Sequence, residues 1–318
     1  MADSERNSTN YRLATYETAQ GPRAGAVSSD AVFDLAELTG KPSYSTMLGV
    51  LDDWAKAEPL IEAALVKEGA KKGSSVTGSP LAKVRLLAPV LYPPTIFCAG
   101  ANYFDHMAEM SRVFNLTLEP NPAKAGLAPW HFIKVSRTIV QTDARIPLPA
   151  RTKMLDWEAE LGAVIGLAAK NVPVERALDY VAGYTVGNDL SARDFAARPN
   201  VPETSPFRFD WISHKSFDGA CPVGPWIVPA KQIPDPQRLG IKLWVNDVLK
   251  QDSHTSKMIF SLAEQIAQLS ARLTLHPGDL ILTGTPAGVG MARKEFLKSG
   301  DVVRVWVERV GELTTTLT

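Results

Sequence analysis

Two glutamates stand one residue apart in an alternating segment near the middle of the chain. Residues 157–165 alternate apolar side chains with the others, so a strand here places Glu158 and Glu160 together on one face. Like charges so close repel, and the arrangement is stable when water solvates that face or when a divalent cation lies between the carboxylates. This segment alone leaves both interpretations open.

A third acid stands at the end of another apolar segment. Residues 181–186 read as a strand that runs into a polar cluster, which begins with Asn188 and Asp189. Carboxylate oxygens are the ligands that a hard cation such as Mg²⁺ selects, and the chain has no HExxH sequence or clustered histidines that would indicate zinc. The three acids together therefore favour an oxygen-only cation site.

Candidate catalytic groups lie on either side of these acids. His106 and Glu109 are three residues apart on an expected short helix, so they share a face and can hydrogen-bond. Glu109 would then orient the imidazole and raise its basicity, giving a dyad that deprotonates water, although surface pairs with no catalytic role have the same spacing. Lys215 offers a positive charge to an anionic substrate or a developing oxyanion.

A glycine-rich loop follows the strand expected at residues 280–283. It matches neither the phosphate-binding pattern GxxxxGK[ST] nor the dinucleotide pattern GxGxxG. Glycines such as Gly284 allow a ligand to approach the backbone closely, and Thr285 offers a hydroxyl, while a tight turn is the alternative.

The elements that must position these residues form a β-rich body with scattered helices. The Pro and Gly punctuation disfavours regular βαβ alternation, and the fold class expected is mixed β-rich α+β. A helix is expected over residues 257–273. The expected strands are 95–99, 157–165, 181–186, 241–245, 280–283 and 302–307.

The first part of the chain has a different composition. Residues 11–38 predict a small set of strands, and residues 45–68 predict a helix with a break or a new first turn at Pro59. Residues 70–80 are rich in Gly and Ser and are typical of a linker. We therefore expect a small N-terminal accessory domain with its linker at 1–80 and a catalytic domain at 81–318.

Charge and composition exclude several kinds of partner. The 318 residues include 34 Lys and Arg against 34 Asp and Glu, so a nucleic-acid partner held by phosphate neutralisation is not expected. The 2 cysteines form no disulfide framework, and no run reaches the roughly 18 apolar residues of a membrane span. These features fit a cytoplasmic protein with no membrane partner.

Five motifs follow one another along the chain. They are NYFDHMAE at 102–109, DWEAELG at 156–162, GYTVGNDLSARD at 183–194, KSFD at 215–218 and TGTPAGVG at 283–290. In this order and at these spacings they resemble the fumarylacetoacetate hydrolase family, in its branch of bacterial acylpyruvate hydrolases and 2-hydroxyhepta-2,4-diene-1,7-dioate isomerases. The likeness runs from about Pro89 to the C-terminus, whereas the first 80 residues are similar only in size and pattern to the small domain that many members carry.

The resemblance implies a fold, a cofactor and a set of site residues. The fold would be the family's fumarylacetoacetase C-terminal-like β-roll, and the protein would be a homodimer that binds Mg²⁺ or Mn²⁺. The metal ligands would be Glu158, Glu160 and Asp189. The catalytic residues would be His106, Glu109 and Lys215, the first two on a segment that is often a mobile lid in relatives. The substrate-binding residues would be Arg193, Gly284 and Thr285.

The resemblance also implies a chemistry. The cation would chelate a small anionic 2-oxo acid and act as an electron sink, and water activated by His106 and Glu109 would cleave the C–C bond of an acylpyruvate or related 2,4-dioxo acid. The same sink serves a lyase or isomerase, such as an oxaloacetate-type decarboxylase, a 2-oxo acid hydratase or a hydroxymuconate-type isomerase. A non-catalytic anion-binding member would lack part of this residue set, which is complete here.

One segment departs from the family pattern. Ala196 stands where many relatives have a substrate-contacting glutamine, and residues 195–214 are longer and richer in Pro and aromatic residues than expected. Phe207, Phe209 and Trp211 could line a pocket for a larger or aromatic acyl group, or they could pin a surface loop.

Overall fold

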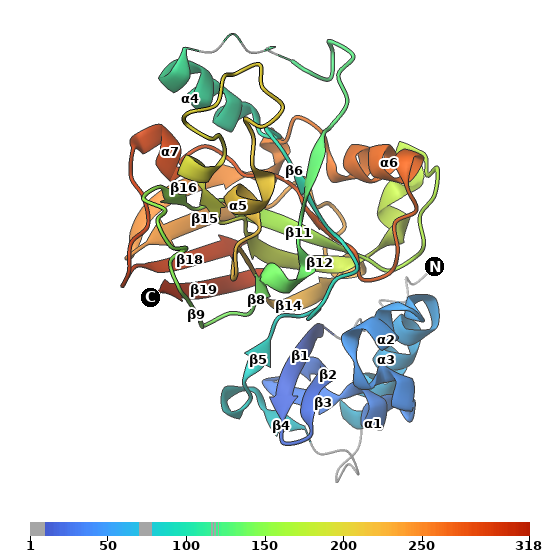
Figure 1. Cartoon of the computed structure of the whole chain (residues 1–318). Coiled ribbons are helices and arrows are strands. Elements are labelled where there is room, and N and C mark those ends of the chain that lie inside the picture. The colour runs from blue at the N-terminus through green and yellow to red at the C-terminus, as the bar shows by residue number, and fades with distance from the viewer. Residues whose placement is uncertain (1–9, 70–77, 116, 118, 120) are drawn as a thin grey trace.

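Three sheets carry the fold in the computed structural model, which describes residues 10–69, 78–115, 117, 119 and 121–318 (Figure 1). The largest sheet, of 12 strands among the described residues, contains β1 Arg12–Thr18, β2 Gly21–Ser28, β3 Ala31–Asp34, β4 Ser79–Pro80, β5 Leu86–Leu87, β6 Ile96–Ala99, β7 His131–Lys134, β8 Ile139–Val140, β11 Ala159–Ile165, β12 Val181–Asn188, β14 Cys221–Pro229 and β17 Leu280–Leu282. A sheet of 5 strands contains β9 Ala144–Ile146, β15 Gly240–Val245, β16 Val248–His254, β18 Val302–Val307 and β19 Gly311–Leu317. The third sheet pairs β10 Leu155–Asp156 with β13 Ser191–Ala192.

Helices lie at the periphery of these sheets (Figure 1). The α-helices are α1 Leu35–Thr39, α2 Met47–Leu51, α3 Trp54–Gly69, α4 Phe104–Phe114, α5 Trp211–Lys215, α6 Leu262–Arg272 and α7 Gly290–Arg293. None of the helices in the described ranges has both the length and the apolar character that crossing a membrane requires. The mixed β-rich α+β class expected from the sequence is confirmed.

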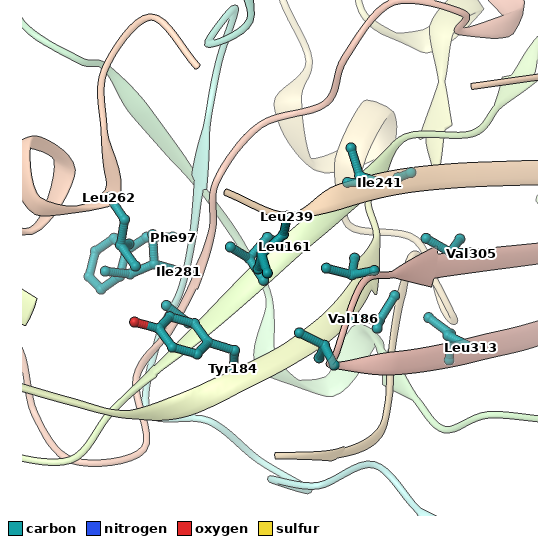
Figure 2. Close-up of a cluster of buried hydrophobic side chains, with 14 of the residues drawn as sticks. Phe97, Leu161, Tyr184, Val186, Leu239, Ile241, Leu262, Ile281, Val305 and Leu313 are labelled. Carbon is teal, nitrogen blue, oxygen red and sulfur yellow. The ribbon is translucent and has the colours of Figure 1, made fainter. Parts of the chain in front are cut away.

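The main core lies between the large sheet and the 5-stranded sheet. Figure 2 shows Leu161 and Val186, from β11 and β12, beside Ile241, Val305 and Leu313 of the other sheet. The residues predicted to share the apolar face of segment 157–165 all belong to this core, namely Trp157, Ala159, Leu161, Ala163 and Ile165. β11 and β12 are antiparallel neighbours in the middle of the large sheet, so their ends meet at one edge of the core.

The N-terminal strands continue the large sheet of the body. β1 pairs with β14 at Leu13 and Ile227, and a second hydrophobic cluster joins Trp54 of α3 to Val164 of β11. Ser79 and Pro80, expected in the linker, form β4 beside β3, whereas residues 70–77 lie outside the described residues. The domain division at residue 80 stays a prediction.

Two helix boundaries differ from those expected. α6 begins at Leu262 rather than at residue 257, because Ser261 and Glu264 form a capping box there and the segment before it is tied to Asn102 by backbone and side-chain bonds. Pro59 does not break the N-terminal helix. It lies inside α3, and the helical segment is instead interrupted at residues 52–53, between α2 and α3.

The contact of α3 with the body predicts a large effect of Trp54→Ala. Trp54 is buried, and a Cβ added to Gly166 would lie 2.6 Å from its ring, so the fit is tight. Removing a buried indole costs about 3–5 kcal/mol in free energy of unfolding. We expect a loss of this size in chemical denaturation. Val66→Ala, at a side chain exposed on the same helix, should change the value by less than about 0.5 kcal/mol, and equal effects would contradict the shared core.

Candidate active site

The three predicted metal ligands meet where β11 begins and β12 ends. Ala159 pairs with Asn188 in the ladder, so Glu158 and Asp189 flank the same point, and Glu160 follows one residue inside β11. One carboxylate oxygen from each of the three residues lies within 4.8 Å of the other two. The side chains are buried, so the interpretation as a solvated face is wrong. The structure brings together the acids that the sequence nominated.

Buried cations surround this carboxylate cluster of Glu158, Glu160 and Asp189. The Lys215 ammonium lies 2.9 Å from a Glu158 oxygen and 2.7 Å from an Asp189 oxygen. Lys134, at the end of β7, binds the other Asp189 oxygen and donates to the Leu190 carbonyl at 3.1 Å. Each lysine therefore neutralises a charge that burial would otherwise make unfavourable.

Arg193 links the cluster to a fourth buried acid. Its guanidinium donates to Asp156 at 2.9 Å and also to Glu158. Asp156 further accepts backbone N–H bonds from Trp157, Gly290 and Met291, so its oxygens are occupied by structural contacts. Asp156 thus holds Arg193 and the start of α7 in place.

The charges shift the pKa values of the cluster in opposite directions. Burial raises the pKa of Glu158, but the charges of Lys215 and Arg193 outweigh it and hold that pKa well below its usual range. Burial, together with the charges of Asp189 and Glu158, raises the pKa of Glu160. Among the described residues no lysine or arginine forms an ion pair with Glu160, which makes this carboxylate the least compensated of the three.

This donor set fits a hard divalent cation. The three side chains supply only carboxylate oxygens, and within the described ranges Glu160 accepts a single hydrogen bond, from the Gly284 N–H at 2.7 Å. With Asp156, four acids face three cations in the described cluster, so the cluster carries excess negative charge when all four acids are ionised. An Mg²⁺ or Mn²⁺ ion would compensate that excess.

A cavity of about 150 Å³ opens beside the cluster. Its lining includes five of the predicted site residues, namely His106, Glu158, Arg193, Lys215 and Thr285. Burial lowers the pKa of His106 to about 4, so its imidazole is neutral at pH 7, and its Nδ1 has no hydrogen-bond partner among the described residues. A neutral, unpaired imidazole at the cavity wall can accept a proton.

The hydrogen bond expected between His106 and Glu109 is not formed. Glu109 instead accepts the Gly288 N–H at 2.8 Å and is not among the cavity-lining residues. Asp105 accepts from Ser253 at 2.6 Å and from the Ala287 N–H at 3.3 Å. Both carboxylates therefore attach α4 to the glycine-rich loop, because backbone N–H groups of that loop point toward the helix and donate to them.

The glycine-rich loop contains Gly284 and Thr285, the two residues predicted there to bind substrate. Gly284 has φ +96° and a Cβ there would lie 2.8 Å from Asn102, so only glycine fits without strain. Gln251 accepts the Ala159 N–H at 2.9 Å, which orients its amide nitrogen toward the Thr285 hydroxyl, also at 2.9 Å. Because Thr285 accepts this bond, its own O–H is free to donate elsewhere.

Several residues of the site were missed in the sequence. Asp156 stands inside a motif and His214 directly precedes one, but the pattern assigned no role to either. Lys134, Gln251 and Trp130 lie in segments that carry no motif. Of the three aromatic residues proposed for a pocket, Trp211 lines the cavity, whereas Phe207 and Phe209 are exposed and do not belong to its lining.

Comparison with known proteins identifies the family. The family model described as fumarylacetoacetate (FAA) hydrolase C-terminal matches residues 95–318, so the chain belongs to this family. A mitochondrial oxaloacetate tautomerase from Xenopus laevis is 42% identical over 233 residues, which cover 73% of this chain and 67% of the relative. A second one, from Bos taurus, is 35% identical over 96% of this chain and 90% of the relative.

Solved structures extend the similarity to the N-terminal part. Maleylpyruvate hydrolase from Sphingobium sp. SYK-6 has a TM-score of 0.72 and 31% identity, covering 96% of this chain and 99% of that chain. Another structure of that hydrolase holds a manganese(II) ion and pyruvate. 5-Carboxymethyl-2-hydroxymuconate delta-isomerase from Mycobacterium smegmatis has a TM-score of 0.69 and 29% identity over 96% of this chain and 99% of that chain. The family fold expected from the motifs is confirmed.

The uncompensated carboxyl group of Glu160 predicts opposite effects of Glu160→Gln with and without metal. The amide keeps the shape but removes a buried acid whose ionisation its surroundings oppose, so the metal-free variant should be more stable, by at most about 1 kcal/mol. Wild-type protein at a Mn²⁺ concentration one hundred times Kd should gain about 2.7 kcal/mol, and the variant should gain much less. Thermal unfolding with and without Mn²⁺ measures both. Glu203→Gln, at an exposed position, should behave as wild type, and full Mn²⁺ stabilisation of Glu160→Gln would refute the ligand role.

Three histidines predict a loss of stability in acid. Burial lowers the pKa from 6.5 to about 4 for His106 and His131 and to about 3 for His214. Between pH 6.5 and 4 the unfolded chain therefore binds more protons, so stability is complete above pH 6.5 and falls toward pH 4. The loss at pH 5 is roughly 1–2 kcal/mol per histidine.

Urea denaturation at pH 7.5 and pH 5 measures this loss. His131→Phe removes one titrating group away from the carboxylate cluster, and the difference between the two pH values should shrink. The exposed His276 provides the control, because His276→Phe should leave that difference unchanged. Identical pH dependence in all three proteins would show that His131 is not perturbed.

Proposed function

We propose that the protein is a divalent-metal-dependent enzyme that hydrolyses the C–C bond of an acylpyruvate or related 2,4-dioxo acid. The observation that carries the proposal is a single cavity lined by a carboxylate of the cluster, by the neutral and unpaired His106, and by the cations Arg193 and Lys215. Such a cavity combines an anion site, a proton acceptor and a place for a cation. The substrate proposed is a small anionic 2-oxo acid.

Glu158, Glu160 and Asp189 would hold Mg²⁺ or Mn²⁺. When bound, the cation supplies a Lewis acid that polarises the 2-oxo acid and compensates the negative charge developing on it. Arg193 and the O–H of Thr285 face the same cavity and would orient the substrate carboxylate. The carboxylates of the cluster keep Lys215 protonated, because they raise its pKa against the lowering effect of burial.

His106 would act as the general base. Its imidazole takes one proton from a water molecule, and the resulting hydroxide attacks the 4-oxo carbon of the substrate. Lys215 stabilises the oxyanion, the C3–C4 bond breaks, and its electron pair stays on C3 of the departing pyruvate fragment. A proton then adds to C3, so the products are a carboxylic acid and pyruvate. Glu109 would contribute by holding α4, and hence His106, on the glycine-rich loop.

A second candidate reaction is the tautomerisation of an oxaloacetate-like acid. It is favoured by the 42% identity with an oxaloacetate tautomerase. This reaction needs the same cation and a group that moves a proton at C3, but no water, and His106 could carry it out without a hydrogen-bonded Glu109. The homodimer, the cytoplasmic location and the choice between Mg²⁺ and Mn²⁺ stay predictions.

A substrate panel separates these reactions. Purified protein with Mg²⁺ or Mn²⁺ is given acetylpyruvate, benzoylpyruvate, fumarylpyruvate, oxaloacetate and a hydroxymuconate-type acid, and the products are followed by NMR. We expect equimolar pyruvate and carboxylic acid from at least one 2,4-dioxo acid, and loss of this activity with a chelator. If enol–keto exchange of oxaloacetate were the sole activity detected, the assignment would change from hydrolase to tautomerase. CO₂ release alone would support a decarboxylase.

Two variants at histidines make the panel diagnostic for mechanism. His106→Asn should lower kcat by about 10²–10⁴-fold while oxalate still binds in calorimetry, because the base is removed and the anion site is kept. The exposed His276 gives the matched control, His276→Asn, with unchanged kcat. Normal turnover by His106→Asn would exclude it as the base.

A further inference from the structure

An aromatic wall forms one side of the cavity. We use this name for Trp130, which precedes β7, Phe132 of β7 and Trp211 of α5. The rings of Phe132 and Trp211 are stacked with centroids 5.3 Å apart, and Trp130 lies 6.1 Å from Phe132 and 6.0 Å from Trp211. His214 continues the wall at 5.7 Å from Trp211. Segments distant in the sequence thus form one continuous apolar surface.

The rings are fixed in position yet keep free faces. A Cβ on Gly100 would lie 2.0 Å from the Trp130 ring, so that ring rests directly on the Gly100 backbone. Trp130 remains 48% exposed and Trp211 46% exposed although they pack on each other. Rigid aromatic faces open to a cavity bind flat apolar groups with little loss of conformational entropy.

The rings of the wall carry no charge. The two cations in the described lining of the cavity, Arg193 and Lys215, are held at the carboxylate cluster, where the 2-oxo acid end of the substrate would bind. Burial lowers the pKa of His214 to about 3, so its ring is neutral at pH 7. A carboxylate placed against these rings would lose its hydration without gaining an ion pair.

The wall lies next to the reacting end of the cavity. The Lys215 ammonium is 5.0 Å from the centroid of the Phe132 ring, so the apolar surface starts directly beside the carboxylate cluster. A substrate whose 2-oxo acid end lies near the cluster would therefore place its far end on the rings.

We infer that the aromatic wall binds the acyl group of the substrate and selects one that is neutral and flat, such as an aryl ring, over one that ends in a carboxylate. The inference deepens the proposed function and rests on it for the position of the 2-oxo acid end. It identifies Trp130 and Trp211 as residues that determine substrate specificity.

A matched pair of unreactive 2-oxo acids tests the inference without turnover. 4-Phenyl-2-oxobutanoate and 2-oxoglutarate share the 2-oxo acid end and differ at C4, where one carries a phenyl ring and the other a carboxylate. Isothermal titration calorimetry with Mn²⁺ present should give at least tenfold tighter binding of the phenyl compound. Equal binding, or a preference for 2-oxoglutarate, would overturn the inference.

Variants then locate the preference. Trp211→Ala and, separately, Trp130→Ala should reduce the ratio of the two Kd values severalfold, because each removes one face of the wall. Phe207 is 69% exposed in the same segment and does not line the cavity, so Phe207→Ala should leave the ratio unchanged. An unchanged ratio in both tryptophan variants would contradict the role of the wall.

Pyruvate and oxalate distinguish failure of this inference from failure of the proposed function. If neither binds in the presence of Mn²⁺, the 2-oxo acid site itself is wrong. If they bind while the phenyl compound shows no preference, the proposed function stands and the inference fails. In the turnover panel the corresponding result is a higher kcat/KM for benzoylpyruvate than for fumarylpyruvate.

Discussion

Burial of three carboxylates within 4.8 Å of one another is the constraint on which the rest of the structure depends. Like charges in a low-dielectric interior repel strongly, so such a cluster persists only with compensating charge. Lys134, Lys215 and Arg193 supply most of it and come from three separate elements. The packing of β7, α5 and the segment after β13 around the ends of β11 and β12 follows from this requirement.

Compensation is incomplete at Glu160, and this gives the site its chemistry. A fully neutralised cluster would be an inert structural network, whereas an acid without a paired cation leaves an attraction for a divalent ion. The glycine-rich loop serves the same point, because Gly284 donates to Glu160 and Thr285 lines the adjacent cavity. Gln251 hydrogen-bonds both to that loop and to the start of β11, so it fixes the position of the loop relative to the cluster.

The cavity has a charged side and an aromatic side, and we assign them different roles. The charged side holds the cation site and the anion-binding groups on which the proposed hydrolysis and the alternative tautomerisation both depend, since each requires charge to develop next to the 2-oxo group. The aromatic wall of Trp130, Phe132 and Trp211 comes from segments outside the five motifs. The proposed selection of the acyl group therefore depends on residues that the five motifs do not include.

Residue pattern alone determined much of the charged side. Alternation in residues 157–165 placed two glutamates on one face, and the polar end of the strand at Asp189 supplied the third acid, because side-chain direction in a strand depends only on local backbone geometry. The motifs also indicated the loop of Gly284 and Thr285. The strand at 302–307 was predicted to the residue for the same local reason.

Only the tertiary structure decided which distant groups meet that face. It showed that the acids are buried rather than solvated, that Lys134 reaches Asp189, and that Glu109 binds Gly288 instead of His106. It also separated Trp211, which lines the cavity, from the neighbouring exposed Phe207. These contacts join residues far apart in the chain, and their choice depends on sheet pairing and on the balance of buried charge, which no local spacing encodes.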